Sequence, residues 1–233
     1  MKKMLPFLFL ISFSACVSTD TTESTNVAAA EVYQDYNINV NKENSDATAT
    51  FRVAGKTGTT IDLDAPAKVE LNGKPMDESK PGFLKGTTYQ FSATGVVSQF
   101  QFVFTNSDGK TYQNEIGLAP IEITAKSLTF SKAQKTMIPL SRALAAGESI
   151  VLTLHGQSAT EANASSLVSS GVETDSSRSA AILDPSMIKE MALGKGDVRV
   201  ECSKSEKVKQ GTRSGGTIQI TYNSVAIPAT IIN

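Results

Sequence analysis

The sequence predicts an all-β protein made of two tandem antiparallel β-sandwich domains. The chain is rich in Thr, Ser, Val, Ile and Gly and contains no Trp, a composition that suits strands and turns. Many short segments alternate apolar and polar residues, which is the period of a half-buried strand. Turn residues separate these segments at short intervals, as is typical of sandwiches.

The first fifteen residues predict an export signal. Lys2 and Lys3 give a positive start, and residues 4–13 are almost wholly apolar. The small residues Ser14 and Ala15 follow at once, so charge, apolar run and processing point stand in the order of a secretory signal. The apolar run is too short to cross a bilayer, which needs about 20 residues. We therefore expect it to direct export and then be removed.

Residues 13–16, Phe-Ser-Ala-Cys, resemble the lipobox of bacterial lipoproteins. The resemblance implies that the Cys16 thiol is diacylated with chains such as palmitate. It also implies cleavage after Ala15 and frequent acylation of the new amino terminus. Phe13 departs from the aliphatic residue that the family usually has there. Val17 stands where enterobacterial lipoproteins kept in the inner membrane carry Asp, so the analogy favours the outer membrane.

Ordinary secretion is the alternative to lipidation. The general signal peptidase prefers small side chains one and three residues before the cut. A cut after Ala15 would place bulky Phe13 in the second of these positions, whereas a cut after Ser14 would use Ser12. Two or three acyl chains would give lasting attachment, because each buried methylene contributes about 0.8 kcal/mol. The first predicted partner is therefore the membrane, bound through Cys16.

The chain divides into four predicted parts. Residues 1–15 are the signal peptide, 16–46 a lipid-anchored flexible linker, 47–122 the first sandwich and 123–233 the second. The linker is rich in Ser, Thr, Asn and acidic residues, and Lys42 is its only basic residue. A flexible coil of about 30 residues would have a root-mean-square span of roughly 30 Å. Within it, only residues 31–40 have enough apolar content for an edge strand.

The first sandwich is predicted from alternation and turn signals. Residues 47–53 alternate, and Asn72-Gly73 after residues 68–71 is a strong hairpin signal. In residues 99–104 three Phe alternate with polar residues, and residues 106–109 turn the chain back into a partner strand. The strands expected here are 47–53, 68–71, 87–92, 99–104 and 110–116.

The second sandwich begins beyond a boundary over residues 119–125. Its expected strands are 127–130, 150–155, 197–202, 217–222 and 225–232. Residues 156–181 are rich in Ser, Ala and Thr and predict a loop with one weak edge strand near Leu167. Asp184 as cap and Pro185 at the first position predict a helix of about two turns that ends at Gly194.

Both halves end with an alternating strand, a polar turn and a second strand. This layout resembles the immunoglobulin-like modules that are common in exported bacterial proteins. The chain lacks the buried Trp and paired Cys of true immunoglobulin domains. The resemblance therefore implies an arrangement of strands and no functional residues.

The residues predict no catalytic, cofactor-binding or metal-binding site. His155 is the only histidine, and alternation turns it away from the apolar face of its strand, so neither a nucleophile–base pair nor a zinc site is expected. Cys202 shares a face with Val198 and Val200, which predicts a buried thiol. It has no disulfide partner if Cys16 carries lipid. The formal net charge of -1 gives no electrostatic reason to bind nucleic acid.

Two groups of charged residues allow other interpretations of the function. Asp62 and Asp64 flank Leu63 and would face the same side of a strand, as a carboxylate hydrolase could use them. With Asp108 they could also bind calcium through oxygen-rich loops. A basic cluster near a predicted turn could bind an anionic glycan or lipid headgroup, although Glu201 and Glu206 dilute its charge. The cluster consists of Lys204, Lys207, Lys209 and Arg213.

The function predicted from these observations is that of a lipid-anchored cell-envelope lipoprotein with a non-enzymatic binding or structural role. Its partner would be an envelope protein or glycan. Function on rigid sheets usually sits in the loops, and the candidate surfaces are residues 72–86 and 156–181. The alternatives are an envelope glycan hydrolase that uses carboxylates, and a subunit of a larger envelope assembly or surface appendage.

Overall fold

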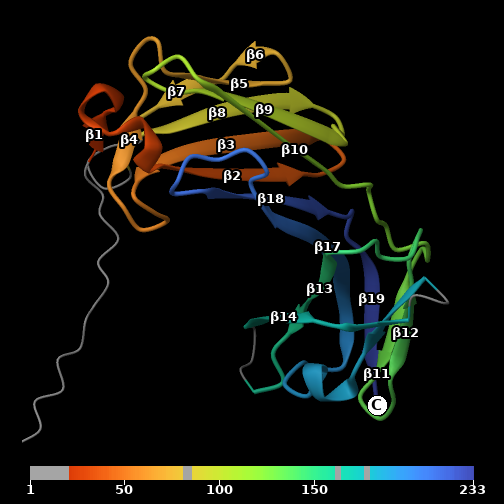
Figure 1. Ribbon diagram of the computed structural model, residues 1–233. Helices are drawn as coiled ribbons and strands as arrows, with labels where there is room; N and C mark the ends of the chain where they lie inside the picture. Colours follow the sequence, from red (N-terminus) through yellow and green to blue (C-terminus); the bar gives the residue numbers. More distant parts are fainter. Residues whose placement is uncertain (1–20, 81–85, 161–163, 176–178) are drawn as a thin grey trace, which may run out of the picture.

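The computed structural model describes residues 21–80, 86–160, 164–175 and 179–233 (Figure 1). These residues form strands in three sheets, and their helical structure is limited to short 3-10 turns. No helix in this part of the chain is long and apolar enough to span a bilayer. The all-β prediction is confirmed.

The first sandwich has the strand layout of an immunoglobulin-like domain. In the standard letters for immunoglobulin strands, one sheet has the order A-B-E-D, and the other has the order C′-C-F-G with a short C′ strand. The first sheet consists of β2 (Val32–Val40), β3 (Asn44–Val53), β8 (Thr88–Thr94) and β7 (Asp77–Ser79). The second consists of β6 (Lys74–Pro75), β5 (Lys68–Leu71), β9 (Gln99–Thr105) and β10 (Thr111–Gly117). β1 (Thr21–Glu23) pairs in parallel with β4 (Thr60–Asp62) beside the first sheet.

The second sandwich repeats this layout. Its B-E-D sheet has three strands, and its other sheet carries C′, C, F and G with an additional strand parallel to G. The first of these consists of β12 (Thr136–Pro139), β16 (Ala180–Leu183) and β15 (Glu173–Asp175). The other consists of β14 (Ser165–Gly171), β13 (Glu148–Gln157), β17 (Gly194–Lys207), β19 (Ile227–Ile232) and β11 (Leu128–Ser131). The prediction of two immunoglobulin-like sandwiches is confirmed.

Aromatic side chains fill the space between the sheets of the first sandwich. Phe100, Phe102 and Phe104 of β9 point inward and are almost completely buried. The ring of Phe102 stacks on Tyr36 with centroids 4.3 Å apart, and Phe104 stacks on Phe51 at 4.5 Å. Ring pairs of this kind contribute about 0.5–1.5 kcal/mol beyond their buried area. The alternation of β9 therefore supplies the centre of this core.

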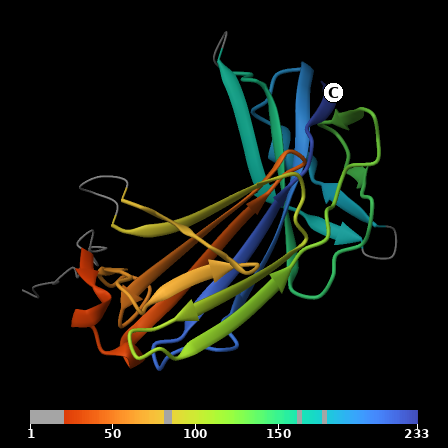
Figure 2. The same ribbon diagram turned by 90° about the horizontal axis from the view of Figure 1, so that it is seen from above.

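One hairpin of the second sandwich extends into the first. β17 pairs along one edge with β13, and along the other first with β19 and then with β18 (Gly216–Asn223). β18 in turn pairs in parallel with β2, so it completes the edge of the first sandwich's A-B-E-D sheet. Figures 1 and 2 show the long blue strand running beside the red-orange β2. The two sandwiches thus share a continuous sheet.

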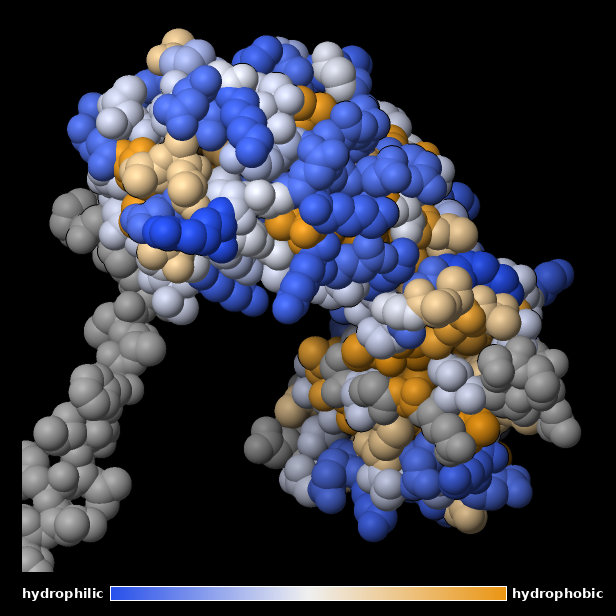
Figure 3. Space-filling model, in the orientation of Figure 1, coloured by the Kyte–Doolittle hydropathy of each residue, from blue (hydrophilic) through white to orange (hydrophobic). Residues whose placement is uncertain are grey.

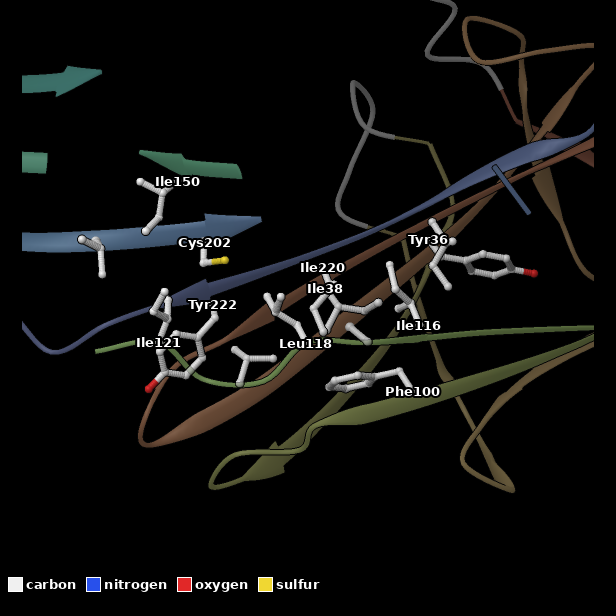
Figure 4. Packing of buried hydrophobic residues seen from close by; sticks show 14 of the residues in the cluster. Tyr36, Ile38, Phe100, Ile116, Leu118, Ile121, Ile150, Cys202, Ile220 and Tyr222 are labelled. Carbon is white, nitrogen blue, oxygen red and sulfur yellow. The ribbon is translucent and has the colours of Figure 1, made fainter. Parts of the chain in front are cut away.

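The hydrophobic core is continuous across the junction as well. Ile150 and Cys202 of the second sandwich lie next to Tyr222 of β18, which leads to Ile220 and then to Ile38 of β2 (Figure 4). All five are at most 4% exposed. β18 belongs to the predicted second domain, residues 123–233, but it packs in the first sandwich. The predicted boundary near residue 122 therefore does not separate two independent hydrophobic cores.

The prediction of a flexible linker over residues 16–46 is wrong for residues 21–46. β2 is an inner strand between β3 and β18, and Tyr36 in its centre is completely buried. Every second side chain of β2 is buried while the residues between them are partly or fully exposed. The exposed Asp and Asn residues gave the segment a polar composition, although its period was that of a strand.

The predicted two-turn helix after Asp184 is also wrong. The chain forms a single 3-10 turn over Pro185–Ile188, and Gly194 begins β17 instead of ending a helix. The cap itself is present, since Asp184 Oδ1 accepts a hydrogen bond from the Ser186 amide at 2.9 Å. Ile188 and Met191 are fully buried. Short helices are unstable by themselves, so packing of these two side chains decides the local conformation.

Candidate functional site

The predicted lipidation residue, Cys16, lies outside the described residues. The described chain begins five positions later at Thr21, which pairs with Thr60 of β4. The hydroxyls of these two residues are 2.9 Å apart. The Asp64 amide donates a hydrogen bond of 2.9 Å to Ser24 Oγ. The N-terminal segment is therefore fixed to the first sandwich from its first described residue.

The two candidate loop surfaces lie in different sandwiches. Residues 72–86 contain the short strands β6 and β7 of the first sandwich, and residues 156–181 contain β14 and β15 of the second. The parts of these ranges over 81–85, 161–163 and 176–178 lie outside the described residues. The two surfaces are far apart in Figure 1 and form no common site.

The strand β14 presents an uncharged edge. It is the last strand in the order of the shared sheet, and its sequence contains neither a charged residue nor Pro. Leu167 on this strand is 61% exposed, more than any other large apolar side chain in the described chain. Figure 3 shows apolar surface gathered on this side of the second sandwich, whereas the first is mostly hydrophilic there. Charges and Pro commonly protect edge strands from pairing, and β14 has neither.

The two acidic residues that could serve a hydrolase lie in different surroundings. Asp62 forms an ion pair with Lys80 at 2.5 Å and accepts a hydrogen bond of 3.2 Å from the Tyr89 hydroxyl. Hydrogen bonds to Asp62 and Glu78 raise the pKa of Lys80, so this side chain stays charged. Asp64 is exposed to solvent. Asp62 is thus engaged by Lys80 and Tyr89 within the first sandwich.

The calcium reading gains no support. Among the described residues, no three His, Cys, Asp or Glu side chains lie close enough together to hold a metal ion. Asp108 lies in the turn between β9 and β10, where Asn106 Oδ1 accepts a hydrogen bond from its amide at 3.1 Å. Such contacts are the usual reason for Asn and Asp in turns.

The predictions for His155 and Cys202 are confirmed. His155 is exposed on the outer face of β13, and Cys202 is completely buried with Val198 and Val200. Burial, together with the nearby charge of Glu148, raises the pKa of the Cys202 thiol to about 11. The thiol is therefore protonated at neutral pH and behaves as a small apolar side chain.

The basic cluster is divided by ion pairs. Lys204 contacts Glu206 at 2.6 Å, and Arg213 contacts Glu31 at 2.7 Å. Lys209 lines a cavity of about 230 Å³ with Gln113, Glu115 and Gln210. Small-molecule sites usually enclose about 300–1,000 Å³, and this cavity is smaller and carries both charges. The cluster does not form one cationic site.

The junction between the sandwiches contains polar residues that the sequence did not reveal. Glu122 accepts hydrogen bonds from the Tyr222 hydroxyl and, at 3.2 Å, from the Val225 amide. Arg142 binds Glu148 at 2.6 Å and donates to the Ala119 carbonyl at 2.5 Å. Glu122 and Tyr222 are 100 positions apart, and only the fold brings them together.

Fold and surface together define a class: an all-β protein of two immunoglobulin-like sandwiches joined by a shared sheet. No protein-family model matches the chain, and no curated protein does.

Two solved structures are similar in outline. The adhesin InvE of Yersinia pseudotuberculosis is 12% identical over 85% of this chain, with a TM-score of 0.22. The FN1–FN3 domains of chicken CNTN1 are 11% identical over 85% of this chain and 67% of their own, with a TM-score of 0.24. The chain spans 60% of the length of the adhesin. Similarities of this size establish no common function.

Proposed function

We propose that this protein is a lipid-anchored envelope lipoprotein, held in the outer membrane through Cys16, with a non-enzymatic binding or structural role. The observation that carries the proposal is the cysteine itself, which follows an apolar run and two small residues. The fold supports a binding or structural role, because it consists of two sandwiches with loops and an uncharged strand edge on their surface. Its partner is an envelope protein or glycan.

The test compares the two cysteines of the full-length chain. Cys16→Ala should abolish incorporation of labelled palmitate and release the protein from the membrane fraction. Cys202→Ala is the matched control, because it removes the other thiol, which is buried in the core; it should keep the label and the membrane association. Incorporation of palmitate into Cys16→Ala, or equal membrane association of both variants, would contradict the lipid anchor.

A role as subunit of a larger envelope assembly is favoured by one specific observation, the uncharged edge of β14. An extended segment of a partner can add to such an edge through backbone hydrogen bonds. We expect Leu167→Lys to reduce the amount of partner recovered after crosslinking in membranes. Because surface substitutions usually change stability by less than about 0.5 kcal/mol, the fold should be unaffected. An unchanged set of crosslinked partners would argue against β14 as the contact.

The hydrolase alternative has a direct test. Purified protein is incubated with peptidoglycan and envelope polysaccharides, and the Asp62→Asn and Asp64→Asn variants are assayed beside it. The proposal expects no turnover by any of the three proteins. Turnover that disappears in the variants would replace the binding role by a catalytic one.

A further inference from the structure

We propose that one end of the first sandwich faces the membrane and that the second sandwich is the membrane-distal end of the molecule. The membrane-facing end consists of β1, β4 and the turn over residues 54–59. The partner of this end is the lipid surface that holds the anchor. The inference rests on the lipid anchor at Cys16 proposed above and adds the orientation of the protein on it.

The first argument is the length of chain between the anchor and the fold. Thr21 is the fifth residue after Cys16 and already pairs with Thr60. A fully extended chain covers about 3.3–3.6 Å per residue, so five residues reach at most about 18 Å. The anchored end is therefore held close to the lipid, unlike a domain on the flexible linker that the composition of residues 16–46 predicts.

The second argument is the position of Thr21 in the fold. Its partner strand β4 pairs with the C-terminal end of β3, at Arg52. Nearby, the Ala54 amide donates a hydrogen bond of 2.7 Å to the Glu31 carbonyl, and the Glu31 side chain binds Arg213. These contacts gather β1, the 54–59 turn and the tip of the β17–β18 hairpin at one end of the molecule. Figure 1 shows β1 and β4 at the end of the first sandwich away from the second.

The third argument is the length of the strands that lead away from this end. β3 has 10 residues and runs from Val53 near the anchored end to Asn44 at the junction, a span of about 33 Å. β17 has 14 residues and continues into the second sandwich as far as Gly194, a span of about 46 Å. Because both strands lie inside one hydrogen-bonded sheet, the distance between the two ends of each strand is fixed. An 18 Å connection therefore reaches the first sandwich and not the second.

The experiment measures the distance of three surface positions from the lipid. A single cysteine is introduced in place of Lys56 near the anchor, Lys42 at the junction or Gln134 at the far end, all of which are exposed. Each carries a fluorophore, while Cys202 is buried and does not label in the native state. The lipidated proteins are placed in vesicles whose lipid headgroups carry a nitroxide quencher. We expect quenching to be strongest at position 56, weaker at 42 and absent at 134.

Two controls separate this inference from the anchor itself. Protein that does not float with the vesicles is not anchored, and that result would refute the proposed function. Protein that floats but is quenched equally at positions 56 and 134 is anchored and lies flat, which would overturn the orientation.

In a second variant, about 30 Gly and Ser residues are inserted before Thr21. The insertion adds a root-mean-square span of roughly 30 Å and should abolish quenching at position 56. Unchanged quenching at position 56 would show that the short connection does not set the orientation.

Discussion

The two sandwiches have the same strand layout but are filled by different side chains. Among the described residues, the first core contains seven buried aromatic side chains, namely Tyr36, Phe51, Tyr89, Phe100, Phe102, Phe104 and Tyr112. In the described part of the second sandwich, the core is built from Ile, Leu, Val, Ala and Met side chains, and Phe130 is the one buried aromatic residue outside the shared strand β18. Aromatic side chains bury the largest areas and dominate core energetics. We therefore expect the core of the first sandwich to contribute more to the free energy of unfolding than the core of the second.

The shared sheet compensates for this difference. The second sandwich sends the β17–β18 hairpin into the first, so that β18 packs Ile218, Ile220 and Tyr222 against the aromatic core. Ser224 lies where β18 leaves β17; its hydroxyl accepts from the Val200 amide at 2.9 Å, and its own amide donates to the Val200 carbonyl at 2.9 Å. The comparison indicates that the second sandwich depends on the first for stability, and that both unfold together.

The largest expected effect comes from Phe102→Ala. Loss of a buried Phe side chain usually costs about 3–5 kcal/mol, and this ring also stacks on Tyr36. Unfolding in urea can be followed in the first sandwich by tyrosine fluorescence, since four of the five tyrosines lie there. Cys202 reactivity reports the second sandwich. We expect both signals to shift together to lower urea.

A matched change in the second sandwich is Leu152→Ala, for which about 2–5 kcal/mol is expected. Leu152 is 1% exposed. If the sandwiches are independent, each variant will shift only the signal of its own sandwich, and the proposed dependence fails.

The next effect concerns the junction. Tyr222→Phe leaves the carboxylate of Glu122 without the hydroxyl that donates to it, and hydrogen bonds to charged groups contribute about 1.5–3 kcal/mol. Tyr33→Phe is the matched control, because the Tyr33 hydroxyl donates at 3.3 Å to the neutral Thr217 hydroxyl. Urea unfolding should show a larger loss for Tyr222→Phe. An equal loss in both variants would mean that the junction contributes no special stability.

The smallest effect at neutral pH is that of the Cys202 thiol. Its pKa is raised by burial to about 11, from the ordinary value of 9.0. A raised pKa in the folded state means that the stability contribution is complete below about pH 9 and is lost as the pH rises towards 11. Cys202→Ala should therefore lose less stability than the parent between pH 9 and 11, in urea titrations at each pH. Parallel loss in both proteins would place the titrating group elsewhere.

Most elements of the fold were predictable because they depend on local pattern. The alternation of Phe100, Phe102 and Phe104 specified an inward face, and Asn72-Gly73 specified a hairpin, since both take positive φ angles of 49° and 75°. The inward position of Cys202 and the exposure of His155 follow from the same period of two. β2 was assigned to the linker because its exposed residues are polar, although residues 31–40 have enough apolar content for an edge strand. β12 and β16 were not predicted because they are short.

The sequence by itself determined the class of fold, the inward faces of the main strands and the cysteine on which the lipid-anchor proposal depends. Each of these is a property of neighbouring residues, through strand period, turn geometry or the order of charge and apolar run. Only the tertiary structure decided that β18 joins β2, that Glu122 meets Tyr222, and that Thr21, five residues after Cys16, pairs with Thr60 of β4. These contacts join residues up to 184 positions apart, and such pairing is set by the packing of a common core, which no local pattern contains.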